Sequence, residues 1–319
     1  MDKSYVIISP CRNEQKYMHQ TMDTVINQTL KPTKWVIVDD GSTDDTAKIL
    51  KEYADKHSFI EIVTRENRGH RSVGPGVIDT FYAGYNTIEI DDYAYICKLD
   101  LDLNLPKVYF ETLINEMEKD PRLGTFSGKP YFCKGQTKEL IPEVCGDESS
   151  VGMTKFYRVN CFKEIGGFVR QVMWDGIDSH RCRLLGWISR SDNDPSLRFI
   201  HLRPMGSSQK SIITGRVRHG YGQYFMGTRF PYMFASVIFR LNKKPYVIGS
   251  LATLWGYIKS ILVNKEKLND PKMQNLMNKF HWQSLFIGKN SAVAKINIER
   301  EDYFGTSVEK YDIPNKSQL

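Results

Sequence analysis

The stretch YAYICKLDLDLNLP, residues 93–106, runs from an apolar segment into two carboxylates one residue apart, Asp100 and Asp102. A short run rich in Tyr and Ile is typical of a half-buried strand, and the apolar spacing over residues 110–117 predicts a helix after Pro106. The two acids then lie on a loop between a strand and a helix. That place is the carboxyl edge of a sheet, where α/β proteins bind their ligands.

Two explanations account for acids at this edge. Clustered carboxylates repel one another, and a divalent cation that takes oxygen ligands and neutralises a bound diphosphate would stabilise them. Asp102 is then the better candidate for a metal ligand. Alternatively, the acids interact favourably with the dipole of the helix that follows. The pair alone does not decide between the two.

The stretch VIVDDGSTDDT, residues 36–46, has the same organisation. A strand runs into Asp39 and Asp40, which are followed by a glycine turn and a helix with one apolar face. Ser42 and Asp45 form a capping pattern for that helix, and capping leaves Asp39 and Asp40 unexplained. Their carboxylates would accept a hydrogen bond from the ring N–H of a pyrimidine or from a ribose hydroxyl.

A third strand end comes first in the chain. The apolar stretch 5–9 is followed by Pro10, Arg12 and Glu14, and then by apolar residues at helical spacing over 18–26. Strands that alternate with helices predict an α/β fold. Polar groups after three strands indicate one binding edge at their carboxyl ends.

The motifs SPCRNE (9–14), VDDGSTDD (38–45) and KLDLDLNLP (98–106), in this order and at these separations, resemble the nucleotide-sugar half of family 2 glycosyltransferases. EIGGF (164–168) and WDGIDSHRCRLLGW (174–187) resemble the acceptor half of that family. The resemblance covers about residues 4–220. It implies the α/β fold called GT-A, a Rossmann-like mixed central sheet flanked by helices.

The resemblance also implies a domain organisation. Residues 1–225 would form the GT-A catalytic domain, with the nucleotide-sugar half over about 1–105 and the acceptor half over about 106–225. Residues 226–319 lie beyond the resemblance, and their own apolar, aromatic and basic pattern predicts a C-terminal helical extension that associates with a membrane.

By the same resemblance, the nucleotide-sugar contacts fall on residues that match the family's motifs. They are Pro10, Arg12 and Glu14 in the first loop, Asp39 and Asp40 as the acid that binds the base, Arg71 as a nucleotide or diphosphate contact, and the pair Asp100 and Asp102. This pair matches the DxD motif, in which the first acid faces the ribose or sugar and the second binds Mn²⁺ or Mg²⁺.

The resemblance places the general base at Asp175, the second member of a Glu-Asp pair in the family. The first member is Trp174 here, and Asp178 is the alternative base. His201, in the strand-like stretch LRFIHLRP, matches a position that supplies a further metal or diphosphate contact in related GT-A enzymes. Without the resemblance, it is equally compatible with an ordinary, partly buried histidine.

The implied reaction is an inverting displacement. An acceptor hydroxyl attacks the anomeric carbon, a carboxylate takes its proton, and the metal stabilises the departing diphosphate. Basic residues after His201, Arg203 and Arg218 among them, either face water or help the diphosphate to leave. Processive synthases of this family carry QxxRW in this region. Neither Gln209 nor Gln223 is followed by the remaining residues of that motif. Its absence favours the addition of a single sugar to a glycan or a lipid-linked acceptor.

Two other functions fit parts of the pattern. A nucleotidyltransferase that makes a nucleotide sugar can share the α/β core and paired acids, but its first loop is usually rich in Gly and Lys, and SPCRNE has no glycine. A binding protein that keeps the fold without turnover is the second alternative. The missing glutamate before Asp175 is its only support.

The charge of the chain is unevenly distributed. The 319 residues carry a formal net charge of +7, yet no acid occurs between Asp194 and Glu266, where eleven Lys and Arg residues are interleaved with aromatic residues. Such a segment suits an anionic membrane surface and a polyprenyl-diphosphate-linked acceptor. A helical cap whose cations face water is the alternative. No nucleic-acid motif is present, so nucleic acid is not an expected partner.

We expect peripheral attachment to the inner face of the cell membrane. The apolar stretch 246–263 has 18 residues and contains Lys259, whereas a membrane span needs about 20 predominantly apolar residues. The N-terminal stretch MDKSYVIISP lacks a secretory apolar core, and the six cysteines contain no CxxC pair. Both features favour a reducing, cytoplasmic location.

Overall fold

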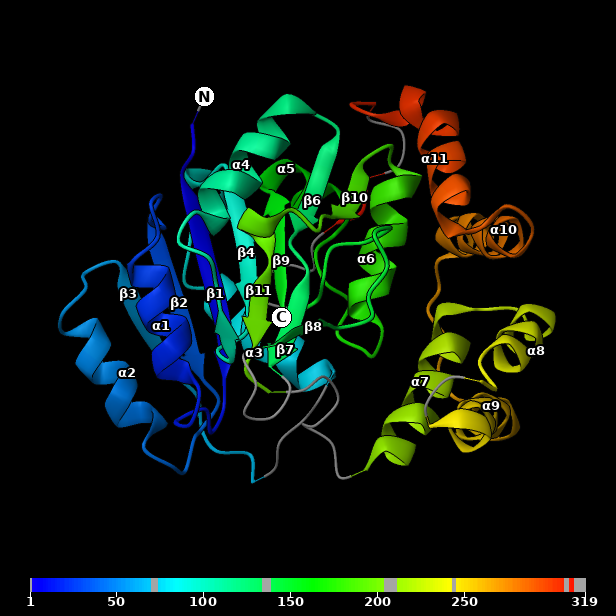
Figure 1. Ribbon diagram of the computed structural model, residues 1–319, viewed down its shortest axis with the longest axis horizontal. Coiled ribbons are helices and arrows are strands. Elements are labelled where there is room, and N and C mark those ends of the chain that lie inside the picture. Colours follow the sequence, from blue (N-terminus) through cyan, green and yellow to red (C-terminus); the bar gives the residue numbers. More distant parts are fainter. Residues whose placement is uncertain are drawn as a thin grey trace.

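The computed structural model describes residues 2–69, 74–133, 139–203, 211–242, 245–306 and 310–312. Its centre is a seven-stranded sheet with the order β10-β6-β9-β4-β1-β2-β3 (Figure 1). The strands are β1 (Tyr5–Cys11), β2 (Lys34–Asp39), β3 (Ile60–Thr64), β4 (Tyr95–Leu99), β6 (Leu123–Ser127), β9 (Thr154–Arg158) and β10 (Ile188–Ser191). Of these, β9 alone is antiparallel to its neighbours, so β1 to β4 end at one edge.

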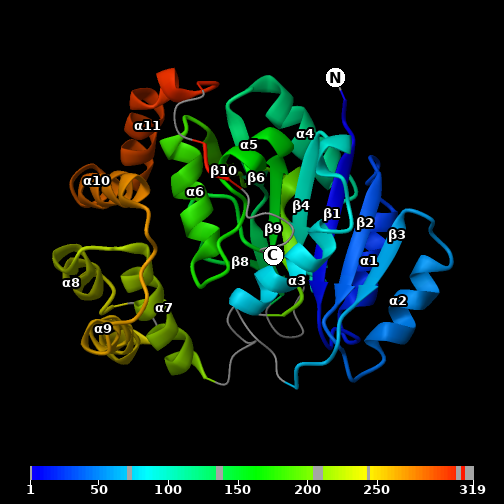
Figure 2. The same ribbon diagram turned by 180° about the vertical axis from the view of Figure 1, so that it is seen from behind.

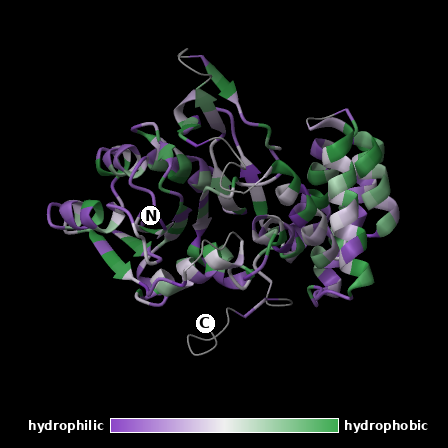
Figure 3. Cartoon of the chain, turned by 90° about the horizontal axis from the view of Figure 1, so that it is seen from below, coloured by the Kyte–Doolittle hydropathy of each residue, from purple (hydrophilic) through white to green (hydrophobic). Residues whose placement is uncertain are grey.

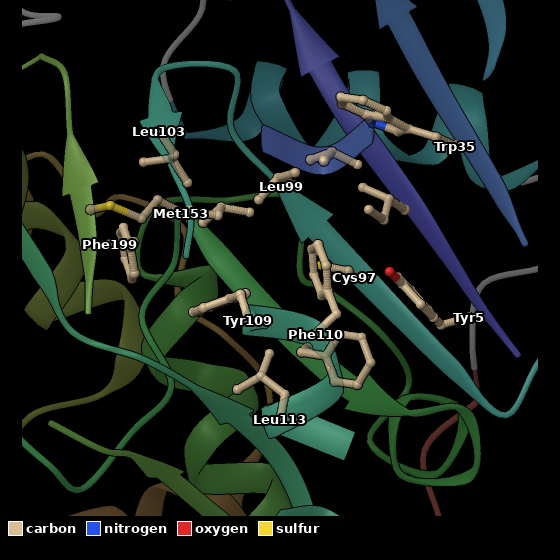
Figure 4. Close-up of a cluster of buried hydrophobic side chains, with 14 of the residues drawn as sticks. Tyr5, Trp35, Cys97, Leu99, Leu103, Tyr109, Phe110, Leu113, Met153 and Phe199 are labelled. Carbon is tan, nitrogen blue, oxygen red and sulfur yellow. The ribbon is translucent and has the colours of Figure 1, made fainter. Parts of the chain in front are cut away.

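Helices cover both faces of the sheet because successive strand residues point to opposite sides. Tyr5, Trp35 and Cys97 point to one face, where Figure 4 shows their packing, and Val6 and Val36 point to the other. The helices are α1 (Met18–Ile26), α2 (Thr46–Ala54) and α4 (Tyr109–Lys119) on the first face, and α3 (Pro75–Tyr85), α5 (Val159–Glu164) and α6 (Trp174–Leu184) on the second. Burial on both sides makes the sheet a firm support for the loops at its edge.

A second, smaller sheet joins two distant parts of the chain. Its order is β5 (Leu103–Asn104), β11 (Phe199–His201), β7 (Pro130–Cys133) and β8 (Leu140–Pro142). In the antiparallel pair of β11 and β5, His201 lies opposite Leu103, and the Leu202 N–H donates to the Asp102 carbonyl at 2.8 Å. This pairing brings His201 beside the acidic loop.

The C-terminal helices form a column beside α6 (Figures 1 and 2). They are α7 (Ile212–Met226), α8 (Phe230–Phe239), α9 (Tyr246–Leu262), α10 (Pro271–Ile287) and α11 (Lys289–Glu299). Ile177 of α6 packs in an apolar cluster with Phe225, Met277 and Ile296, which attaches α7, α10 and α11 to the sheet domain. Short 3₁₀ turns occur at Ile90–Asp92, Pro195–Leu197 and Glu301–Tyr303. Within the described ranges, every helix is too short or too polar to cross a bilayer.

The predicted α/β class, with its mixed central sheet and C-terminal helices, is confirmed. The differences lie at the ends of elements. Helix α2 begins at Thr46, and Ser42, which the sequence pattern predicts as its cap, instead accepts the Asn13 N–H at 2.9 Å. The wrong prediction has a physical reason, since a loop-to-loop contact outcompetes the cap. The division into residues 1–225 and 226–319 stays a prediction.

Candidate functional site

A cavity of about 630 Å³ opens at the carboxyl ends of β1, β2 and β4. That volume suits a small-molecule ligand. Strand ends line one side of it, the N-terminal turns of α3 and α6 line another, and α7 closes it. Its polar lining includes Arg12, Glu14, Asp40, Lys98, Asp100, Asp102, Asp175, His201, Arg203, Arg218 and His219.

Asp40, directly after β2, is a buried carboxylate among three arginines. Arg65 Nη1 lies 3.3 Å from Asp40 Oδ1, Arg68 Nε lies 3.1 Å from Oδ2, and Arg12 donates to the Asp40 carbonyl. An acceptor flanked by donors fits a ring that presents an N–H between two carbonyls, as uracil and thymine do. Arg65 and Arg68 are absent from the sequence prediction, although Arg65 follows β3 and the strand-end argument would have found it.

Asp39 lies outside the cavity lining and organises the loop instead. Its Oδ1 accepts the Ser42 N–H at 2.9 Å. Asn13, with a positive φ of 54°, accepts the Thr43 N–H at 2.8 Å through its side chain. These bonds fasten the loop after β1 to the loop after β2, so the first acid of the pair shapes the turn and Asp40 faces the ligand space.

Asp100 is held by a buried lysine. Lys98 forms an ion pair with Asp100 and donates to the Gly152 carbonyl at 3.1 Å. Burial raises the pKa of Asp100, and the charge of Lys98 offsets this only in part. The sequence does not predict this contact, because Lys98 has the pattern of an ordinary strand residue.

Asp102 and His201 face each other in the cavity. His201 Nε2 lies 3.7 Å from Asp102 Oδ2, and His201 Nδ1 lies 3.1 Å from each carboxylate oxygen of Glu143. Arg203 Nε lies 3.5 Å from Asp102 Oδ2, and its Nη2 donates to Glu14. The loops after β1, β4 and β11 are thus joined by alternating charges.

These contacts set the protonation of the two groups. Burial by itself would raise the pKa of Asp102, but the hydrogen bond and charge of His201 and the charge of Arg203 lower it below its ordinary value. Burial likewise disfavours the charged form of His201, whereas Asp102 and Glu143 outweigh burial and raise its pKa to about 9. Asp102 is therefore an ionised carboxylate at neutral pH.

The geometry fits a divalent cation held by few protein ligands. Oxygen and imidazole nitrogen suit Mn²⁺ and Mg²⁺, and a separation of 3.7 Å accommodates two ligands at about 2.1 Å from one ion. Glu143 fixes the ring so that Nε2 faces Asp102, as carboxylates behind ligating histidines do. Within the described ranges, no group of three or more His, Cys, Asp or Glu side chains is arranged to hold a metal ion by itself. Diphosphate and water oxygens would complete the shell.

Asp175 lies in the first turn of α6 and is exposed to the cavity. The cavity walls displace water around it and raise the pKa of its carboxyl, and the nearby charge of Lys155 offsets this only partly. Trp174, the residue in place of the family's glutamate, is buried with Lys98 and Lys155 at 5.4 and 5.8 Å from its ring. The indole thus lies beside two lysines whose charges are paired with Asp100 and Asp178.

Asp178, the alternative base, is a structural residue. It is buried, pairs with Lys155 and accepts the hydroxyl of Tyr157. Lys155 also donates to the Asp175 carbonyl at 2.7 Å, so this cluster fixes the start of α6. Asp178 is not among the residues that line the cavity.

Most of the predicted site residues meet in the cavity. Those that line it are Pro10, Arg12, Glu14, Asp40, Asp100, Asp102, Asp175 and His201. Asp39 is adjacent in sequence but turned to the loop, and Arg71 lies outside the described residues. Lys98 and Glu143 are additions from the structure, because their roles depend on contacts between distant segments.

Comparisons with known proteins agree with this arrangement. The sequence model named Glycosyl transferase family 2 matches residues 6–140. Chondroitin synthase from Escherichia coli is 31% identical over 114 residues, which are 36% of this chain and 15% of that protein. Poly-beta-1,6-N-acetyl-D-glucosamine synthase from Staphylococcus epidermidis is 28% identical over 120 residues, 38% of this chain and 27% of that protein.

A solved structure extends the similarity beyond the matched segment. GalNAc-T7, crystallised with UDP, GalNAc and Mn²⁺, superposes with a TM-score of 0.58 at 14% identity, covering 91% of this chain and 58% of that one. This likeness confirms the GT-A fold. The segments matched in the two synthases are less than a third of those proteins.

Proposed function

Because the Glycosyl transferase family 2 model matches residues 6–140, we propose that the chain is a transferase of this family. It would move a sugar from a nucleoside diphosphate to an acceptor hydroxyl, with inversion at the anomeric carbon. The observation that carries the proposal is the convergence of Asp40, Asp102 and Asp175, from three separate segments, on one cavity. Each of the three carboxylates has a different environment, as the three parts of a sugar-transfer site require.

In this proposal the donor lies along the strand ends. Asp40 with its arginines binds the base, Asp100 faces the ribose or sugar, and Asp102 with His201 holds Mn²⁺ or Mg²⁺. The bound cation would neutralise charge on the leaving diphosphate. The UDP and Mn²⁺ of the GalNAc-T7 structure support this class of donor and cofactor.

Arg203 is placed to assist the diphosphate. Its guanidinium lies between Glu14 and Asp102 and stacks 5.2 Å from the ring of Tyr17. Guanidinium groups bind phosphate oxygens with two parallel hydrogen bonds. We propose that Arg203 exchanges part of its carboxylate contacts for the diphosphate when the donor binds.

Asp175 acts as the general base in this proposal. Its carboxylate borders Gly152, where an added Cβ would come within 2.9 Å of Oδ2, so the acid lies against bare backbone at the cavity wall. A hydroxyl that enters there would give its proton to Asp175 while it attacks the anomeric carbon. One base suffices for a single displacement, and transfer of one sugar at a time is the form we propose.

We propose a glycan or a polyprenyl-diphosphate-linked glycan as the acceptor, and peripheral attachment to the inner face of the cell membrane as the location. Arg218 of α7 brings positive charge to the acceptor side of the cavity. Burial lowers the pKa of its neighbour His219 to about 4, so that ring is neutral. The acid-free segment between Asp194 and Glu266 supports an anionic partner.

Donor screening tests the proposal. The full chain would be melted with UDP-, GDP- and dTDP-sugars, with and without Mn²⁺, because a ligand that binds only the folded protein raises its apparent stability. We expect a uridine or thymidine donor to raise the melting temperature only when Mn²⁺ is present. Nuclear magnetic resonance of the transferred sugar should then show the inverted anomer. Release of pyrophosphate from a nucleoside triphosphate and sugar phosphate would indicate a nucleotidyltransferase. Donor binding without transfer to any acceptor would indicate the silent binding protein.

A further inference from the structure

Helix α9 has the reverse of the polarity expected for a helix in water. Its buried residues are mostly small, namely Gly249, Ser250, Thr253, Gly256 and Ser260. Its large apolar residues are exposed, namely Val247, Ile248, Leu251, Trp255, Ile261 and Leu262. A helix in water normally buries its apolar stripe. Packing through small residues, with large apolar residues outside, is typical of helices in contact with lipid.

The packing of α9 on α7 fixes this orientation. A Cβ on Gly220 would lie 1.9 Å from the Thr253 carbonyl oxygen, and a Cβ on Gly256 would lie 2.0 Å from the Val217 carbonyl oxygen. The two backbones therefore touch along a seam that admits only glycine at these points. Rotation of α9 to bury its apolar side would bring large side chains into this seam, so the apolar side stays outward.

Helix α8 extends the exposed apolar surface. It packs on Tyr257 of α9 through Met233 and Val237, and it exposes Phe230, Phe234 and Ile238. We call the surface formed by Phe230, Phe234, Ile238, Leu251, Trp255 and Leu262 the α8–α9 face. Figure 3 shows hydrophobic residues along the helices of this extension, at the side of the sheet domain. Clustered aromatic and aliphatic residues of this kind mark an interaction surface.

The charges beside the α8–α9 face indicate its partner. Arg229, Lys259 and Lys265 are exposed, and the sequence holds no Asp or Glu between Asp194 and Glu266. A second copy of the chain bound through this face would bring like charges together, which is unfavourable. Cations around an apolar face with Trp and Phe suit the headgroup region of an anionic membrane.

We infer that the α8–α9 face docks on an anionic lipid surface, with the apolar side of α9 inserted at the level of the headgroups. This inference rests on the membrane attachment proposed above and names the surface that makes it. Helix α7 packs on α9 and carries Arg218 to the cavity, so it would connect the docked surface with the acceptor side of the site. Docking would then keep the enzyme at the membrane that holds a lipid-linked acceptor.

Vesicle binding tests the inference with the full chain. We expect sedimentation with vesicles of phosphatidylcholine that contain about 30% phosphatidylglycerol, weaker binding at high salt, and little binding to phosphatidylcholine alone. The double variant Leu251→Ser/Trp255→Ser should lower the binding constant for anionic vesicles by about tenfold or more. Both side chains are exposed, so the fold should persist, and an unchanged melting temperature would confirm that.

A matched control lies on α10. Phe286 is 81% exposed but outside the α8–α9 face, so Phe286→Ser should leave vesicle binding unchanged. The double variant should also keep transfer to a soluble acceptor, which separates a failure of docking from a failure of the proposed reaction. Three results would overturn the inference: no binding of the wild type to anionic vesicles, equal losses in the Phe286 variant and the double variant, or a dimer in solution that the double variant dissociates.

Discussion

Asp102 at the donor end of the cavity and Asp175 at the acceptor end lie in opposite electrostatic environments. At the donor end, Asp102 lies against His201 and Arg203, which outweigh its burial and lower its pKa. At the acceptor end, the cavity walls displace water around Asp175, and this desolvation raises its pKa. A carboxylate that stays ionised suits a cation, and a carboxylate that takes up a proton more readily suits a general base.

The chemical role of each carboxylate therefore depends on its neighbours more than on its residue type. The donor end is assembled from loops that ion pairs and hydrogen bonds join across the chain. The acceptor end depends on one helix, α6, whose first turn is fixed by the buried cluster of Lys155, Tyr157 and Asp178. Substitutions at the donor end should therefore weaken binding of the donor. Substitutions at the acceptor end should lower turnover or the stability of the fold.

The largest effect is expected from Asp175→Asn. The amide keeps the shape of the side chain but cannot take the proton of the acceptor hydroxyl, so kcat should fall by about a hundredfold to ten-thousandfold. The Kd for the nucleotide sugar with Mn²⁺ should stay within about twofold of the wild type, since the donor contacts are untouched. Steady-state transfer assays and calorimetry measure the two quantities. Near wild-type kcat in this variant would break the assignment of the base.

The second effect concerns the cluster below α6. Lys155→Met leaves the carboxylate of Asp178 buried without its cation, and such a change typically costs about 3–5 kcal/mol in the free energy of unfolding. Urea denaturation would measure this loss. As a control, Lys163→Met breaks a solvent-exposed ion pair with Asp91. It should lower the free energy of unfolding by at most about 1 kcal/mol. Equal losses in both variants would contradict the structural role of Asp178.

The third effect is an indirect one at the donor end. Glu143→Gln removes the carboxylate that orients His201, and substitutions behind a metal ligand typically weaken metal affinity by about 10-fold to 100-fold. Mn²⁺ titration in the presence of the nucleotide would show the change. Asp147→Asn, four residues on and paired with Lys129, is the matched control and should leave Mn²⁺ affinity unchanged. If both variants behave like the wild type, His201 does not hold the metal.

The smallest effect is a pH dependence of metal binding. His201 has a pKa of about 9 because Asp102 and Glu143 outweigh its burial. A proton on the ring competes with the cation, so Mn²⁺ affinity should rise between pH 6.5 and 8.5, by about tenfold per unit at most. Without metal, the raised pKa stabilises the fold fully below about 6.5, and this contribution disappears as pH rises through about 9. His201→Gln should remove the pH dependence. A flat profile in the wild type would contradict the ligand role.

The strand ends were predictable from sequence because strand and helix periods, and the acids between them, are local signals. Asp40, Asp100 and Asp102 accordingly follow β2 and β4 and line the cavity. Asp175 lies on α6 and was predicted only from the family resemblance, and the roles of all four stay predictions. The position of Glu143 behind His201 was not predictable, since it depends on the tertiary arrangement of two loops.

The two acids at the end of β2 illustrate the limit of a local signal. Both follow the strand, yet Asp39 turns back to accept the Ser42 N–H and only its neighbour lines the cavity. The reversed polarity of α9 was not predictable either, because the sequence of an apolar helix does not show which side packs on the rest of the protein. Only the glycine seam with α7 reveals which residues face outward.

The central claim is that carboxylates from separate segments meet at one cation and one diphosphate, with the base apart from them. Calorimetric titration of UDP in the presence of Mn²⁺, on Asp102→Asn and Asp175→Asn side by side, tests it most directly. We expect Asp102→Asn to lose the Mn²⁺-dependent part of UDP binding and Asp175→Asn to keep it. Retention of Mn²⁺-dependent binding in Asp102→Asn, or its loss in both variants, would contradict the separation of the metal ligand from the base.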